Sequence, residues 1–169
     1  MRGNKFDKNF LRWSLVLNLL LVLPIICRKP PIKDWLLVYL FNAVTNGILD
    51  SFLSAYNIIQ YPVRFLPKVF KTHILFDFLV YPTFTIIYNQ ITRKDKPFAI
   101  FYKLLFFTIP MTLIELWAVR KTKLIKWKKE WKWYHSFIGF TVKSLITRLF
   151  IGVVRKVERK QKRKQKISV

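Results

Sequence analysis

Five long apolar runs, separated by short connectors rich in Lys and Arg, limit how this chain of 169 residues can fold. They predict helices at about 10–27, 35–53, 74–90, 98–117 and 134–154. A helix of about 20 apolar residues is long enough to cross the hydrocarbon core of a bilayer. Within that core, only helices and closed barrels satisfy every backbone polar group. The pattern therefore predicts an all-α fold, a polytopic transmembrane bundle of about five helices.

The charge of the chain agrees with this prediction. Lys and Arg number 31 against 8 acidic residues, a net charge of +23, while apolar residues make up 53%. A soluble nucleic-acid-binding protein could carry that charge, but its apolar residues would not be collected into five blocks. In a membrane protein, Lys and Arg gather in the connectors beside anionic headgroups. The expected partners are the lipid bilayer and its anionic phospholipid headgroups, with an unidentified membrane protein as an open alternative and no nucleic acid.

Residues 1–154 are predicted to form one transmembrane domain, and residues 155–169 form a charge block without apolar periodicity, which predicts a disordered tail. Asp34 precedes the second apolar run, so we expect it to cap that helix. Cys27 is the single cysteine, which rules out an intramolecular disulfide.

The segment 120–133 alternates cations with Leu, Ile and Trp, a pattern typical of a chain lying in the plane of the headgroups. The connector 55–72, rich in aromatic residues, proline and cations, also suits the interface. The side chains expected to contact lipid headgroups are Arg64, Lys68, Lys126, Trp127, Lys128, Trp131 and Trp133.

Acidic residues occur near one end of three predicted helices. Asp50 is near the end of the second, Asp77 near the start of the third and Glu115 near the end of the fourth. With five crossings, all three lie at similar depth below one face, with His73 and His135 close to that face. The candidate polar seam or ion site therefore comprises Asp50, Asp77, Glu115, Lys103, Lys143, Arg148 and His73. Three acids and three bases can neutralise one another, which is the structural interpretation, or the acids can serve a cation, a proton path or a hydrolytic centre.

Motifs for known chemistry are missing from the sequence. No P-loop, GxSxG, CxxC or HExxH pattern occurs, and we expect no metal and no cofactor. The sequence favours a structural or accessory membrane protein over an enzyme. The alternatives are a small transporter or ion- or proton-conducting protein that uses the carboxylates, and an enzyme acting on lipid headgroups.

The charges of the connectors leave the orientation in the membrane open. With five crossings, each side of the membrane collects fourteen Lys and Arg residues, so the positive-inside rule favours neither side. A chain with four crossings, in which one run does not span, is the alternative to five.

Several blocks of sequence carry a resemblance to a known family. They are RKPPIKDW at 28–35, YPVRFLPK at 61–68, LFD at 75–77, YNQ at 88–90, PMT at 110–112 with Glu115, and WKW at 131–133. Over about residues 28–150 the chain resembles a family of small, uncharacterised multi-pass integral membrane proteins of spore-forming Gram-positive bacteria. The resemblance implies a location in the bacterial cytoplasmic membrane and brings no activity with it.

Overall fold

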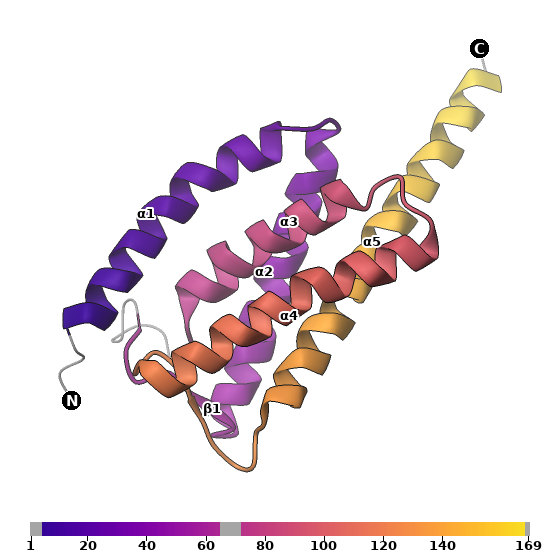
Figure 1. The fold of residues 1–169 in the computed structure, drawn as a ribbon. Coiled ribbons are helices and arrows are strands. Elements are labelled where there is room, and N and C mark those ends of the chain that lie inside the picture. Colours follow the sequence, from indigo (N-terminus) through magenta and orange to yellow (C-terminus); the bar gives the residue numbers. More distant parts are fainter. Residues whose placement is uncertain (1–4, 65–71, 168–169) are drawn as a thin grey trace.

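The computed structural model describes residues 5–64 and 72–167, which form a bundle of helices (Figure 1). Its elements are α1 (Lys5–Cys27), α2 (Ile32–Ala55), β1 (Ile59–Gln60), the π-helix η1 (Phe76–Val80), α3 (Tyr81–Ile91), α4 (Pro97–Lys121), β2 (Lys126–Trp127) and α5 (Trp133–Ile167). Within the described residues, α1, α2, α4 and α5 are long and apolar enough to cross a membrane. The predicted helical bundle is therefore present, and four of its helices have the length and composition of membrane spans.

The short helix α3 is the centre of the bundle. It packs against α1, α2, α4 and α5, and most of its side chains are buried. Successive helices run in opposite directions, so the two ends of the chain lie at opposite ends of the bundle (Figure 1). The third predicted helix, 74–90, corresponds to η1 and α3 together, and Pro82 lies in the first turn of α3, where a proline is tolerated.

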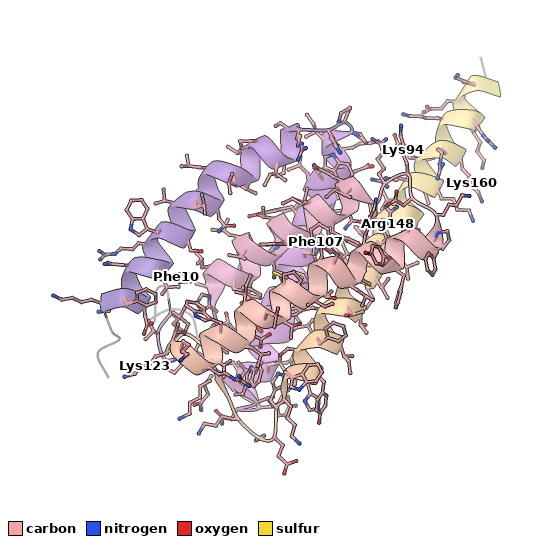
Figure 2. All side chains as sticks on the ribbon, in the orientation of Figure 1. Phe10, Lys94, Phe107, Lys123, Arg148 and Lys160 are labelled. Carbon is pink, nitrogen blue, oxygen red and sulfur yellow. The ribbon has the colours of Figure 1, made fainter. Side chains whose placement is uncertain are left out.

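Unlike a soluble protein, this bundle exposes many large apolar side chains and buries many polar ones. Large apolar side chains are exposed along the outer helices, among them Leu20 at 68% and Phe106 at 72% exposure. The interior holds many Asn, Thr and charged side chains, and α3 alone buries Thr85, Asn89 and Gln90. Labelled cations lie at both ends, Lys123 at one and Lys94 and Lys160 at the other, with Phe107 between them (Figure 2). An apolar belt between two cationic ends is typical of a protein in a bilayer.

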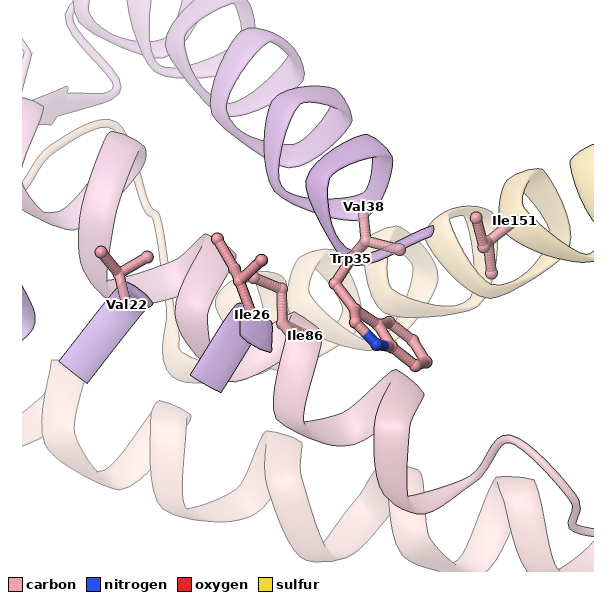
Figure 3. Close-up of a cluster of buried hydrophobic side chains, with 6 residues drawn as sticks. All are labelled: Val22, Ile26, Trp35, Val38, Ile86 and Ile151. Carbon is pink, nitrogen blue, oxygen red and sulfur yellow. The ribbon is translucent and has the colours of Figure 1, made fainter. Parts of the chain in front are cut away.

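An apolar cluster fills the end of the bundle at which α1 ends and α2 begins (Figure 3). It consists of Val22, Ile26, Trp35, Val38, Ile86 and Ile151, from four helices. Trp35 is fully buried, and its indole N–H donates to the carbonyl oxygen of Lys29. This cluster joins α1, α2, α3 and α5 at that end of the bundle.

Two predictions at the same end of the bundle are wrong. Asp34 does not cap α2, which begins at Ile32 after Pro31 without a side-chain cap. Its buried carboxylate instead accepts from the guanidinium of Arg155, at 2.6 Å. Residues 155–167 are not disordered either, because α5 continues through them to Ile167. Arg155 and Glu158 are three residues apart on one helical face and pair with Asp34 and Lys33 of α2, which extends α5 beyond the apolar run.

The two connectors at the other end are joined by a short antiparallel ribbon. Ile59 of β1 pairs with Trp127 of β2, and Gln60 with Lys126. The sequence did not predict this pairing. It holds the basic Trp-rich segment against the end of α2, and so fixes the walls of the site described next.

Candidate functional site

A cavity of about 380 Å³ opens at the end of the bundle where α1, η1 and α5 begin and α2 and α4 end. Its wall is mostly apolar, with Phe10, Phe52, Phe76 and Phe140 among the lining side chains. The polar and charged side chains that line it are Ser14, Asn46, Asp50, Tyr61, His73, Asp77, Glu115, Trp131, His135, Ser136 and Lys143. The cavity therefore brings together the three acids and both histidines that the sequence placed in one layer.

The π-helix η1 carries Asp77, and α2 supports it. The amide of Asn46 donates to the carbonyl oxygen of Asp77 at 3.1 Å, and the hydroxyl of Tyr39 donates to that of Phe78 at 2.7 Å. Short π-helices occur often at functional sites, because the wider turn redirects one side chain. Here the side chain concerned is a carboxylate that is only 2% exposed.

Asp50, Tyr61, Asp77 and Lys143 form one charged cluster in the cavity wall. The carboxyl group of Asp50 interacts with that of Asp77 and with the hydroxyl of Tyr61, and Lys143 attracts both acids. The ammonium of Lys143 also lies 5.2 Å from the centre of the Tyr81 ring. Asp50 Oδ2, Asp77 Oδ2 and Lys143 Nζ are buried, and none has a hydrogen-bond partner among residues 5–64 and 72–167. Buried polar atoms are nearly always bonded, so this cluster has unused capacity for a ligand.

Glu115, the third acid of the cavity, has a different environment. Its Oε1 atom accepts from the indole of Trp127 and from the hydroxyl of Ser136, both at 2.9 Å. The hydroxyl of Ser136 in turn accepts from the indole of Trp131 at 2.9 Å. Glu115 therefore ties the segment between α4 and α5 to the bundle, which is a structural role.

The two histidines support the ends of helices. Nδ1 of His73 accepts from the backbone N–H of Phe76 at 3.3 Å, and Nδ1 of His135 accepts from that of Lys132 at 3.0 Å. Burial lowers the pKa of His73 to about 4, so its ring is neutral at pH 7 and its Nδ1 is free to accept. Burial, and secondarily the charge of Asp50, raise the pKa of Tyr61 well above its usual value, which keeps its hydroxyl protonated. Within the described residues, no group of three or more His, Cys, Asp and Glu side chains could hold a metal ion.

Two predicted members of the polar seam lie elsewhere. Lys103 pairs with Asp95 at 2.7 Å, near the start of α4. Arg148 donates to the carbonyl oxygen of Thr92 at 2.6 Å, just after α3 ends. Both belong to the end of the bundle opposite the cavity, so Lys143 is the one base of the predicted seam that faces the acids.

The side chains predicted to contact headgroups differ in exposure. Lys126, Lys128 and Trp133 are exposed, whereas the indole N–H groups of Trp127 and Trp131 are bonded inside the protein. Arg64 is half-buried and donates to the carbonyl oxygen of Tyr61 at 2.8 Å. Lys68 lies outside the described residues.

Sequence reasoning missed Tyr61 as part of the site and did not include Asn46 among the candidate residues. The spacing of Asn42, Asn46 and Asp50 by four residues does place Asn46 on the same polar face of the second predicted helix as Asp50. Tyr61 has no such signal, since it reaches Asp50 only through the path of the connector after β1.

Comparison with known proteins finds no match for this chain. No family model matches the chain, and no curated protein and no solved structure matches it either.

Proposed function

We propose that this protein is a multi-pass integral membrane protein, an accessory component that binds a small polar or amphiphilic molecule in the cavity at one end of its bundle. The exposed apolar belt supports the membrane location, because such a surface would be unstable in water. The sequence resemblance and the cationic ends further support a bacterial cytoplasmic membrane and contact with anionic phospholipid headgroups.

The observation that carries the binding function is a pair of buried polar atoms without a hydrogen-bond partner among the described residues, Asp77 Oδ2 and Lys143 Nζ. The exposures of these two residues are 2% and 9%, and both line the cavity. A buried polar or ionisable group without a hydrogen bond is costly, and a bound molecule that supplies the missing hydrogen bond removes this cost. A cavity of about 380 Å³ with an apolar wall and a few convergent polar groups has the size and character of small-molecule sites.

Ion or proton conduction is less well supported. Beyond the charged cluster, several polar side chains of the interior bond to one another, as Thr147 does to Asn42 and Tyr81 to Ser144, both at 3.1 Å, while Asn89 Oδ1 and Thr108 Oγ1 have no partner among the described residues. The far end of the bundle holds the apolar cluster around Trp35, and the polar groups beside it are bonded to one another, as Arg155 is to Asp34 and Arg148 to Thr92. A pore needs a polar path through that cluster, whereas a binding site does not.

The binding function can be tested with Asp77→Asn, which keeps the size of the side chain and removes its charge. Native mass spectrometry of the full chain, released in mild detergent from its own membrane, should detect a retained small molecule on the wild-type protein and its loss from Asp77→Asn. Asp95→Asn is the matched control, because Asp95 pairs with Lys103 outside the cavity, and it should retain the molecule.

A structural role for the same carboxylate gives a different result. If Asp77 serves only to neutralise Lys143, Asp77→Asn should lower the thermal unfolding midpoint, and adding Lys143→Met should restore it. That pattern, with no retained molecule on the wild-type protein, would overturn the proposed function.

A further inference from the structure

The cavity has an opening between α2 and α5. These helices are in close contact near the far end, where the rings of Phe41 and Phe150 stack at 4.4 Å. At the cavity end, Leu49, Phe52 and Gly139 line the cavity and are also exposed on the outer surface. A methyl group built on Gly139 would have no atom within 4 Å. The missing side chain at this position leaves a gap that faces the surroundings of the bundle.

The opposite side of the cavity lies between α1 and α4, whose backbones are not closely packed. There the rings of Phe10 and Trp117 contact each other with centroids 5.7 Å apart. A molecule entering from that side has to displace an aromatic ring. At Gly139 no ring contact joins α2 and α5 among the described residues, so we consider this gap as the path of entry, and in a membrane it faces lipid.

The unpartnered atoms describe the polar part of the molecule that fits. Asp50 Oδ2 and Asp77 Oδ2 are acceptors, and Lys143 Nζ is a cationic donor, all in one wall. A primary ammonium bonds to two carboxylate oxygens, and a phosphate bonds to a lysine. A group with both charges, an ammonium joined to a phosphate by a short link, can bond to all three atoms. An ammonium alone leaves Lys143 Nζ without an acceptor, and a phosphate alone leaves the two carboxylate oxygens without a donor.

The depth and shape of the cavity favour a lipid as the source of that group. Asp50 lies between one and two turns before the end of α2, about 7 Å along the helix axis. Amphipathic groups at a bilayer surface sit at about 5–10 Å, where headgroups meet acyl chains. The wall between the charged cluster and the gap is apolar, with Leu49 and Phe52 beside the opening.

We propose that the cavity binds a phospholipid with a primary-amine zwitterionic headgroup, of the phosphatidylethanolamine class, which enters from the bilayer between α2 and α5. The ammonium lies between Asp50 and Asp77, the phosphate contacts Lys143, and the acyl chains leave past Gly139. This inference rests on the proposed function and names the molecule that the cavity binds.

The experiment uses the purified full chain in mild detergent and measures the thermal unfolding midpoint while dioleoyl phosphatidylethanolamine is added. The phosphatidylcholine and phosphatidylglycerol of the same acyl chains are tested in parallel. Choline has no N–H to donate and glycerol has no cation, so both should bind at least about tenfold more weakly than the ethanolamine lipid. Equal stabilisation by all three lipids would overturn the assignment of the headgroup.

Two glycines on α5 test the path of entry. Gly139→Leu fills the gap without touching the charged cluster, and it should abolish the shift caused by the ethanolamine lipid. Gly152→Leu is the matched control, because a Cβ there also meets no atom within 4 Å and Gly152 does not line the cavity, so it should retain the shift. Full retention of the shift in Gly139→Leu would exclude this path.

Free phosphoethanolamine separates this inference from the proposed function. If it stabilises the protein as well as the lipid does, in a manner that needs Asp77 but not the gap at Gly139, the cavity binds a soluble molecule and the lipid assignment is wrong. If neither the lipids nor phosphoethanolamine gives a shift that Asp77→Asn removes, and no molecule is retained on the protein from its membrane, the proposed function fails as well.

Discussion

At the residue scale, the buried acids of this protein have separate roles that their sequence positions do not distinguish. Asp34 forms an ion pair with Arg155, although its Oδ1 atom has no hydrogen-bond partner among the described residues; Glu115 accepts two hydrogen bonds; and Asp77 has an unpartnered oxygen in the wall of the cavity. All three carboxylates occur near the ends of apolar helices. Their environments, rather than their positions, separate the structural acids from the candidate binding group.

If Glu115 has a structural role, the fold should depend on its two hydrogen bonds and not on its charge. One variant that removes only the charge and another that also removes the acceptor atoms test this. Glu115→Gln keeps a carbonyl oxygen for Trp127 and Ser136 and should change the thermal unfolding midpoint little. Glu115→Leu leaves both donors buried without an acceptor, which should cost about 1–3 kcal/mol of unfolding free energy for each donor. The measurement is unfolding in detergent followed by circular dichroism. Equal losses in the two variants would mean that the charge, and not the hydrogen bonds, is what the fold requires.

The ion pair between Asp34 and Arg155 should be the strongest link between α2 and the extended part of α5. The carboxylate of Asp34 is 1% exposed, so Arg155→Met leaves a buried charge without its partner and should cost about 3–5 kcal/mol. The double variant Asp34→Leu, Arg155→Met should recover most of that loss. Lys33→Met removes the exposed neighbouring partner of Glu158 and serves as the control, with no measurable change expected. Chemical denaturation at fixed detergent concentration gives the three values.

At the element scale, the contact between α2 and η1 depends on the absence of a side chain at Gly47. A Cβ atom at that position would lie 2.9 Å from the ring of Phe78. The same face of α2 supplies Tyr39 and Asn46, which bond to the carbonyl oxygens of η1. The close approach of these two elements therefore positions Asp77.

Gly47→Ala should destabilise the protein because the ring of Phe78 has to move. Inserting a methyl group into a packed contact typically costs about 1–3 kcal/mol. Gly152→Ala, which meets no atom within 4 Å, should be neutral or stabilising, since alanine is favoured over glycine in a helix by about 1 kcal/mol. Thermal unfolding of both variants tests the difference, and a Gly47→Ala midpoint at or above that of Gly152→Ala would show that the contact is not tight.

How far the sequence predicts these elements depends on whether a local pattern determines them. Apolar periodicity located the helices, and the four-residue spacing of Asn42, Asn46 and Asp50 identified the polar face of α2. The bond between Asp34 and Arg155 joins residues 121 positions apart, so a prediction from local capping rules was wrong there. The helical end of α5 was missed as well: its first part pairs with α2 through Arg155 and Glu158, a contact that a local pattern does not reveal. The two-residue ribbon and the π-helix are too short to leave a periodic signal.

At the scale of the whole molecule, the bundle is organised around α3, which is mostly buried and has little surface exposed outside the bundle. The outer helices α1, α2, α4 and α5 shield α3, which allows α3 to carry polar side chains and to be shorter than a full span. The sequence left five and four crossings open. Four of the described helices are long and apolar enough to span, and η1 and α3 together are shorter than these four, so the alternating direction of the helices is compatible with five crossings and leaves their number to the experiment that follows.

Five crossings should be visible in the accessibility of single cysteines in intact cells. With Cys27 replaced by serine, cysteines at Lys8 and Lys126 should react with a membrane-impermeant maleimide as one group, and cysteines at Lys94 and Lys160 as the other. All four lysines are exposed at the ends of the bundle, and a lysine at the bilayer centre costs at least about 2.5 kcal/mol, so these positions should lie in water or headgroups. If positions 8 and 160 react together instead, the number of crossings is even and α3 does not span. Asp50 and Asp77 would still lie below one face of the membrane, but Glu115 and the start of α5 with Gly139 would lie below the other, which is incompatible with the cavity that joins them.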